Sequence, residues 1–124
     1  AGSTGMTQIY TPEKADSFNA WGGKFRDRLN DVIGKHGLPM HVSGLGSIMA
    51  IHCSEGPHYN EHDAERDNAL KGELLFYDLL ARGQRMTWRN SMLLCLPMTD
   101  EDIDGYVDAF DDVLATRSHL LAAE

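Results

Sequence analysis

The sequence predicts an α/β (α+β) fold, a two-layer sandwich in which a small, mainly antiparallel sheet of three or four strands is covered by about three helices. Residues 12–35 and 99–114 carry apolar side chains at the 3.6-residue spacing of helices with one buried face. Short apolar runs at 41–53 and 84–96 contain turn residues and are typical of strands. With 124 residues, 42% of them hydrophobic, the chain is long enough for one domain with its own core.

The first helix is predicted from Pro12 to about Lys35. Its start is indicated by Thr-Pro-Glu at 11–13, which combines a capping hydroxyl, a proline in the first turn and an acid near the helix N-terminus. The pair Gly22-Gly23 is unusual, because each glycine in a helix interior costs about 1 kcal/mol relative to alanine. We therefore expect close packing of this helix against another backbone. Its predicted apolar face consists of Phe18, Trp21, Phe25, Leu29, Val32 and Ile33.

Two strands are predicted next, at 41–43 and 47–53, joined through a glycine-containing turn at 44–46. A polar loop follows, and Asn60 is a suitable N-cap for a second helix at 63–81. Apolar residues surround much of that helix, so we expect it to be buried on more than one side. These residues are Leu70, Leu74, Leu75, Phe76, Tyr77, Leu79 and Ala81.

The last third of the chain predicts two more strands and a third helix. The strands are expected at 84–88 and 92–96, on either side of a polar connection at 89–91. The second strand is nearly all apolar, which predicts a central position in the sheet. Thr99 and the acids after it form a capping-box pattern that predicts the start of the final helix. Its regularly spaced apolar residues are Ile103, Tyr106, Val107, Phe110, Val113 and Leu114.

Composition argues against several classes of partner. The chain has 11 Lys and Arg against 19 Asp and Glu, a net charge of −8, whereas nucleic-acid binding needs clustered basic residues. The longest apolar run, Met92–Pro97, is far shorter than the roughly 20 residues of a membrane-spanning helix. Residues 1–10 lack the pattern of a signal peptide, so a cytoplasmic location is expected. Cys53 and Cys95 each lie in an apolar run and are expected to be buried and reduced.

The segment 52–63 contains three histidines, a cysteine and three carboxylates. A metal-binding module could use His58, His62 and one of His52 or Cys53. Neighbouring strand residues point to opposite faces of a sheet, so His52 and Cys53 would not both reach one ion. The segment also lacks the spacing of known zinc motifs, and we expect no bound metal.

Arg89 is the most notable single side chain. It follows Trp88 in a short connection between two predicted strands, where a guanidinium can be presented to a carboxylate. The alternative is a solvated arginine on an exposed loop, which is the common situation of this residue type.

Several segments, in order, resemble one family. They are Gly44–Met49 (GLGSIM), Leu79–Gly83 (LLARG) and Leu94–Asp104 (LCLPMTDEDID), with supporting similarity at 1–2 and 10–13. Together they resemble class III (fold type I) pyridoxal-phosphate-dependent aminotransferases of the glutamate-1-semialdehyde aminomutase-like branch, particularly the β-amino-acid (β-phenylalanine type) transaminases. The resemblance covers the whole chain. It implies that residues 1–10 end the helix leading out of the large domain, and that 11–124 form the C-terminal small domain.

The resemblance also implies what this chain lacks. In that family the Schiff-base lysine, the acid at the pyridinium nitrogen and the aromatic stacked on the cofactor ring lie in the large domain. The lysines of this chain all fall on predicted helices, at Lys14, Lys24, Lys35 and Lys71. We therefore expect a fragment without catalytic or cofactor-binding residues, inactive alone and binding no pyridoxal phosphate. The parent would be a homodimer that moves an amino group between an amino acid, of α or β type, and a keto acid.

The same resemblance implies that Arg89 holds a substrate carboxylate, with Trp88 and Met86 shaping the pocket. Two alternatives to the aminotransferase hypothesis remain besides the metal module. One is a stand-alone α/β small-ligand-binding or regulatory module in which Arg89 binds a small carboxylate. The other is a structural domain that self-associates through an exposed apolar surface. The sequence leaves open the amino donor, the stereochemistry, the oligomeric state and the length of the natural polypeptide.

Overall fold

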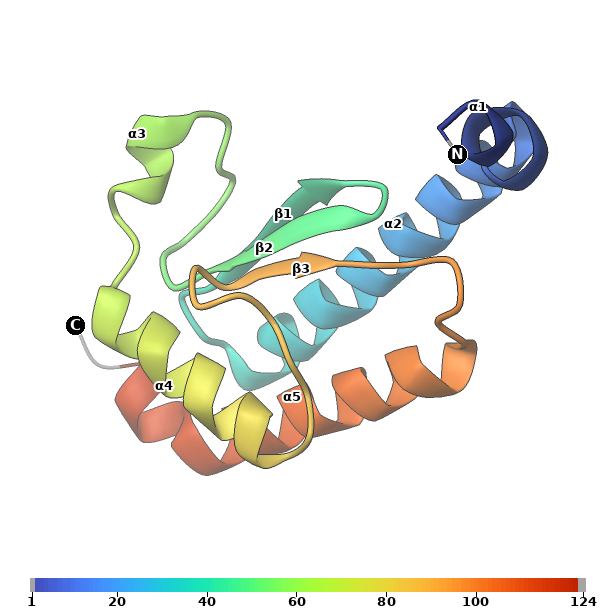
Figure 1. Cartoon of the computed structure of the whole chain (residues 1–124). Helices are drawn as coiled ribbons and strands as arrows, with labels where there is room; N and C mark the ends of the chain where they lie inside the picture. The colour runs from blue at the N-terminus through green and yellow to red at the C-terminus, as the bar shows by residue number, and fades with distance from the viewer. Residues whose placement is uncertain (1, 123–124) are drawn as a thin grey trace.

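The computed structural model describes residues 2–122 and forms the predicted two-layer sandwich. Ala1 and residues 123–124, which the predicted domain ranges include, lie outside the described residues. A three-stranded antiparallel sheet of order β1-β2-β3 has the long helices on one side (Figure 1). The elements are α1 (Gly2–Thr4), the π-helical turn η1 (Gly5–Ile9), α2 (Pro12–His36), β1 (His41–Leu45), β2 (Ile48–His52), α3 (Glu61–Ala64), α4 (Ala69–Ala81), β3 (Ser91–Leu93) and α5 (Asp100–Leu121).

Helix α2 begins and ends where the sequence predicted. The Thr11 hydroxyl accepts a hydrogen bond from the Lys14 backbone N–H at 3.3 Å, and Gly37 ends the helix with a φ of +61°. The side of α2 facing the core buries Phe25, Leu29 and Ile33, three of the six predicted apolar positions. Local capping and periodicity were therefore sufficient to define this element.

The predicted close backbone contact is confirmed for Gly22. A Cβ added there would overlap the backbone carbonyl of Gly46, which has a φ of +59° in the turn between β1 and β2. A Cβ added to Gly23 would meet nothing within 4 Å. Only the first glycine of the pair is thus required by packing.

Strand β1 is longer than predicted, because Gly44 and Leu45 belong to it, and β2 is one residue shorter at each end. The turn between them is only Gly46-Ser47. The outer edge of β1 is occupied by α2. The Asn30 amide accepts from the Val42 N–H and donates to the Val42 carbonyl, both at 2.9 Å. Since these groups are satisfied by a side chain, no further strand is needed beside β1.

The prediction of one continuous helix at 63–81 is wrong, because this segment forms two helices. Asn60 caps α3 as predicted, but a second asparagine, Asn68, caps α4 by accepting from the Lys71 N–H at 3.1 Å. Between them, the carboxylate of Asp67 accepts hydrogen bonds from the neighbouring loop and strand. These tertiary hydrogen bonds hold the chain out of a helical path.

The predicted burial of α4 on several sides is also wrong. Leu70 and Tyr77 are 77% and 64% exposed, and the buried side consists of Gly72, Leu75 and Leu79. This side packs on α5, where the Arg117 guanidinium donates to the Asp78 carboxylate at 2.7 Å. The apolar residues on the outer side therefore remain uncovered within the described chain.

The strand predicted at 84–88 is absent, and β3 is shorter than predicted and lies at the sheet edge. Met86 turns into the core, where the Tyr106 hydroxyl donates to its sulfur at 3.7 Å, and residues 84–88 form no strand. The central strand is β2, which pairs with both β1 and β3. The helices cover one face of β3, and this burial accounts for its apolar residues although the strand lies at the edge of the sheet.

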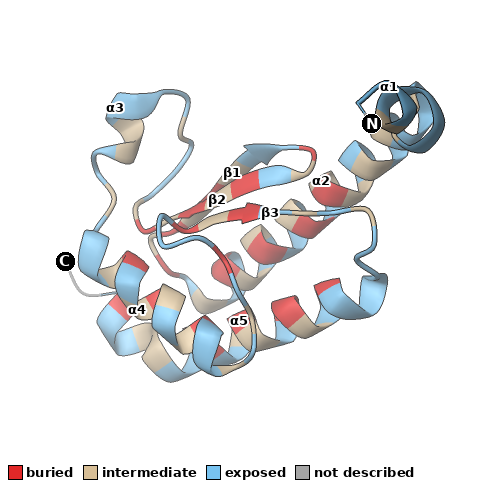
Figure 2. Cartoon of the chain, viewed as in Figure 1, coloured by how far each residue is buried: buried red, intermediate tan, exposed pale blue. Residues whose placement is uncertain are grey.

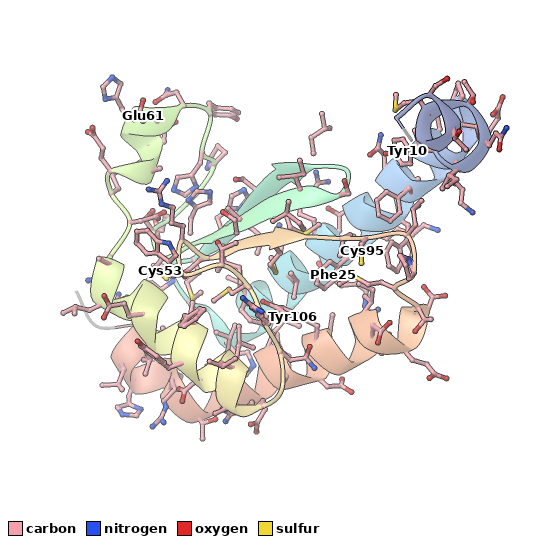
Figure 3. All side chains as sticks on the ribbon, in the orientation of Figure 1. Tyr10, Phe25, Cys53, Glu61, Cys95 and Tyr106 are labelled. Atoms are coloured by element: carbon pink, nitrogen blue, oxygen red, sulfur yellow. The ribbon has the colours of Figure 1, made fainter. Side chains whose placement is uncertain are left out.

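Helix α5 confirms its prediction in full. Its capping box at Thr99 and Asp102 is present, and all six predicted apolar residues are buried. The Phe25 ring meets the Tyr106 ring edge-on at 5.5 Å, which joins α2 to α5 (Figure 3). Figure 2 shows the buried residues concentrated between the helices and the sheet.

Two further predictions concern the burial of the two cysteines and whether any helix spans a membrane. Both thiols are free, but only Cys53 is buried; Cys95 is exposed because the strand around it ends at Leu93. Within residues 2–122, no helix is long and apolar enough to cross a membrane.

We expect Gly22→Ala to lower the free energy of unfolding by about 1–3 kcal/mol, because the added methyl would overlap the Gly46 carbonyl. The matched variant Gly23→Ala should be neutral or stabilising by up to about 1 kcal/mol, since its methyl meets open space. Urea unfolding of both variants measures the difference. Equal effects would contradict the packing role of Gly22.

Candidate functional site

Arg89 lies in a tight turn at the start of β3. The turn is closed by the Asn90 N–H donating to the Thr87 carbonyl at 2.9 Å and by the Thr87 N–H donating to the Ser91 carbonyl at 2.9 Å. The Thr87 hydroxyl also accepts from the Ser91 N–H at 3.1 Å. The backbone that presents Arg89 is therefore held by several hydrogen bonds.

Arg89 and Trp88 lie together, as the sequence predicted. The Arg89 Cζ is 5.0 Å from the centroid of the Trp88 ring, a cation–π distance, and Trp88 is 71% exposed. Among residues 2–122, no carboxylate forms an ion pair with Arg89. Its guanidinium is thus available to a ligand.

Met86 is placed differently. It is 5% exposed and lies in the core beneath the turn, whereas Trp88 and Arg89 are at the surface. Met86 and Trp88 both line an open groove of about 630 Å³ that also includes Phe76 and Leu93. Met86 can therefore shape this groove but does not line the cavity beside Arg89, whereas Trp88 lines both.

A smaller cavity of about 190 Å³, which we call the Arg89 cavity, lies between the turn, β2 and the start of α4. Its lining includes Cys53, Asp67, Asn68, Gly72, Arg89 and Asn90. A guanidinium can bind a carboxylate through two parallel hydrogen bonds, and the N-terminus of α4 carries a partial positive charge. The cavity has the size and the donors for a small carboxylate, and the carboxylates of Asp67 and Glu73 also line it.

Burial and the negative charge of Asp67 raise the pKa of the Cys53 thiol to about 12. The thiol therefore stays protonated at neutral pH and is neither a nucleophile nor a ready metal ligand. This observation argues against the role of Cys53 in a metal module.

The cluster that the structure brings together from segment 52–63 differs from the predicted one. His52 Nδ1 lies 2.7 Å from the Asp67 carboxylate, and the Ser54 hydroxyl donates to the same carboxylate at 2.6 Å. His58 Nε2 lies 2.9 Å from the Ser54 oxygen. His62 takes no part, because it is exposed on α3 and lies 3.6 Å from Glu65.

These atoms of His52, His58 and Asp67 are close enough to hold a metal ion. However, the two imidazole rings are stacked, with centroids 3.9 Å apart and planes 14° from parallel. A ring nitrogen binds metal in the plane of its ring, so two stacked rings do not direct their lone pairs to one point. The geometry fits a hydrogen-bonded network better than a metal centre.

Sequence reasoning missed His41 and Asp67, which belong to the histidine cluster, and Asn90, which lies beside Arg89. His41 stacks on His58 with ring centroids 5.8 Å apart, and Asp67 lies beyond the segment with the concentrated ligands. The pairing of His41 with His52 follows from the hairpin register, which a correct turn assignment would have given. The Asp67 contact spans a loop and has no local sequence signal.

The lysines do not form a site that fits pyridoxal phosphate. Lys14, Lys24 and Lys35 are exposed on α2, and the Lys35 ammonium is 2.7 Å from the Asp111 carboxylate. Lys71 is half-buried in the first turn of α4. A Schiff-base lysine lies in a pocket that also holds the cofactor phosphate, whereas three of these four lie on the exposed side of α2 and the fourth in the first turn of α4.

No family model matches the chain. It is 34% identical over 121 residues to the beta-phenylalanine transaminase of Variovorax paradoxus, covering 98% of this chain and 28% of that protein. It is 28% identical over 107 residues to glutamate-1-semialdehyde 2,1-aminomutase 2 of Staphylococcus saprophyticus, covering 85% and 25%. The chain thus spans about a quarter of the length of these relatives.

Among solved structures, the chain superposes on the beta-phenylalanine aminotransferase of Variovorax paradoxus with a TM-score of 0.92 and 33% sequence identity. The match covers 97% of this chain and 28% of that one. Sequence and structure therefore agree on one group of relatives, and on the same portion of them.

We expect stability to fall as the pH is lowered below about 6.5, partly through His58. Burial lowers the pKa of His58 in the folded state, and its side chain is 3% exposed with no partner for Nδ1 among the described residues. The unfolded chain therefore takes up a proton at higher pH than the folded chain, and the stability contributed by neutral His58 is lost as pH falls.

The measurement is urea unfolding at several pH values between 7.5 and 5. Replacing His58→Gln should flatten this pH dependence, whereas His62→Gln should not, because His62 is 86% exposed. Identical pH profiles for the parent chain and His58→Gln would show that His58 makes no such contribution.

Proposed function

Because the chain is homologous to the C-terminal region of class III (fold type I) pyridoxal-phosphate-dependent aminotransferases, we propose that it is the small domain of such an enzyme. The proposed enzyme transfers an amino group between an amino acid and a keto acid. The observation that carries this proposal is the agreement of 34% sequence identity with a TM-score of 0.92 over nearly the whole chain.

The chain's own residues contribute substrate binding in this proposal, and the remainder of the enzyme supplies the lysine and the cofactor. Pyridoxal phosphate, when bound there, supplies the electron sink for amino transfer. The surroundings of the four lysines support the proposal that this chain binds no cofactor and is inactive by itself.

We assign residues 11–124 to the small domain and 1–10 to the end of a connecting helix. Residues 2–9 are helical but bury no side chain. Their connection to the rest includes the edge-on contact of the Tyr10 and Phe18 rings at 6.4 Å. A helix without its own buried face is expected where a second domain supports it.

The proposed partner of this domain is the large pyridoxal-phosphate-binding domain. On the sheet face away from the helices, Leu45, Ile48 and Leu93 are 87%, 60% and 58% exposed. They are neighbours across the strands, because Leu45 pairs with Ile48 and Ile48 pairs with Leu93. Such a contiguous apolar row is typical of a surface that is covered in the complete protein. A homodimeric parent and a cytoplasmic location stay predictions.

We propose that Arg89 holds the carboxylate of the amino acid or keto acid, with Trp88 beside it and Met86 in the neighbouring groove. The support is its unpaired guanidinium, its hydrogen-bonded turn and the adjoining cavity. Bidentate binding would orient the substrate, and bound substrates react faster when they are held in one orientation.

A second candidate is a stand-alone module that binds a small carboxylate. The observation that favours it is the Arg89 cavity, in which a guanidinium and the start of α4 face a volume of about 190 Å³. Titration of the chain with amino acids and keto acids would detect such binding.

The intact mass of the polypeptide in its source distinguishes the two candidates. We expect a species several times heavier than the 13.8 kDa of this chain, with the absorbance of bound pyridoxal phosphate and transaminase activity. A source polypeptide of 13.8 kDa without cofactor or activity would contradict the aminotransferase proposal and favour the binding module.

In that heavier enzyme, Arg89→Ala should raise KM for amino acid and keto acid by roughly tenfold or more, because a charge-assisted hydrogen bond contributes about 1.5–3 kcal/mol. Arg89→Lys should restore only part of the affinity, since lysine lacks the planar fork. Arg28→Ala is the control, because Arg28 lines neither the Arg89 cavity nor the groove beside it. An unchanged KM in Arg89→Ala would refute the assignment of Arg89.

A further inference from the structure

We propose that Asn90 is the positioning residue for Arg89, and that it acts by locking the turn into a notch on α4 formed by Gly72. This inference rests on the proposed role of Arg89 as the carboxylate-binding residue. It concerns how the guanidinium is held in place, which neither the relatives nor the sequence pattern indicate.

The backbone of Asn90 has an unusual conformation. Its φ is +60°, the only positive φ of a non-glycine residue among residues 2–122. Its N–H donates to the Thr87 carbonyl at 2.9 Å, and its carbonyl accepts from the Ile51 N–H at 3.0 Å. Asparagine adopts this left-handed conformation more readily than most residues with a side chain. Asn90 therefore joins the Arg89 turn to strand β2.

The side chain of Asn90 joins the same turn to α4. Asn90 is 6% exposed, and a Cβ added to Gly72 would come within 2.7 Å of its Nδ2. Gly72 is buried in the first turns of α4, where glycine is a poor helix former. The missing Cβ creates the notch that the Asn90 amide fills.

Several locally unfavourable features thus meet beside Arg89. They are a left-handed asparagine, a glycine within a helix, and the Asn90 Oδ1, which is buried without a hydrogen-bond partner among the described residues. Such costs persist where the surrounding structure imposes them, and they concentrate at binding and active sites. A turn that only connected two elements would not require this combination.

The position of Arg89 depends on this anchor. The Arg89 guanidinium lies 5.0 Å from the centroid of the exposed Trp88 ring and forms no ion pair among residues 2–122. The place from which its side chain starts is consequently set by its backbone, and the neighbouring Trp88 ring holds its far end. The next residue, Asn90, fixes that backbone against β2 and α4 at once. Loss of the amide would leave Arg89 in the protein but would spread its guanidinium over several positions.

The test uses the full-length enzyme and the variant Asn90→Gly. Glycine keeps the positive φ at no steric cost and removes only the amide from the notch, so the domain should still fold. We expect KM for an amino acid donor to rise about tenfold with a smaller change in kcat. KM for a primary amine donor that lacks a carboxylate should be unchanged. A merely structural role would change both donors alike.

Gly72→Ala provides a second variant and a coupling measurement. Alone, its methyl would displace the Asn90 amide and raise KM for the amino acid in the same direction. In the Asn90→Gly background the notch is empty, so Gly72→Ala should add no further increase. Gly34→Ala is the matched control, because Gly34 also lies within a helix but its added methyl would meet nothing within 4 Å, and it lies outside the Arg89 cavity.

The outcomes separate this inference from the proposed function. If Arg89→Ala raises KM but Asn90→Gly does not, Asn90 is not the positioning residue while the role of Arg89 stands. If Asn90→Gly raises KM for the amine as strongly as for the amino acid, the effect is structural and the inference is wrong. An unchanged KM in Arg89→Ala, or a source polypeptide without transaminase activity, overturns the proposed role of Arg89 and this inference with it.

Discussion

The distance between the two layers is set by the contact of α2 with the β1–β2 turn, where Gly22 lies against the Gly46 carbonyl. Arg26 and Asn30 follow at four-residue intervals on the same side of α2, and their side chains bind the backbone of β1. Phe25 and its periodic partners occupy the adjoining side and build the core. The row of Gly22, Arg26 and Asn30 therefore holds the edge of the sheet, and the adjoining row that contains Phe25 fills the core. Both rows depend on the close approach of α2 to the turn, which the missing Cβ of Gly22 permits.

A second constraint links the loop after β2 to the cavity beside Arg89. Asp67 binds His52 and Ser54, and it also forms part of the cavity wall. The next residue, Asn68, caps α4. The interruption between α3 and α4 thus contributes to the cavity, because it places the N-terminus of α4 and the Asp67 carboxylate in the same wall as the Arg89 guanidinium. In a carboxylate-binding site, the negative charge of Asp67 opposes the ligand, so the positive charge of Arg89 and the N-terminus of α4 have to outweigh it.

Local signals were enough to predict α2 and α5, because caps and apolar periodicity act within a few residues. They failed where a distant contact decides the outcome. Met86 leaves the predicted strand to meet Tyr106, and Asp67 interrupts a helix to meet His52. For the candidate site, sequence pattern identified Arg89 and Trp88, whereas Asn90 depends on a notch in α4 that no local pattern reveals. The family resemblance added the domain assignment that periodicity alone could not provide.

The side-chain pairing along the sheet edges also affects aggregation. The outward backbone groups of Val42 are bound by Asn30, and those of Ser91 are bound by Thr87 at the opposite edge. A strand from another molecule would have to break these bonds before it could extend the sheet, which is a recognised protection against intermolecular β-structure. The domain can therefore expose an apolar sheet face for association through side chains while its edges resist the backbone pairing from which fibrils grow.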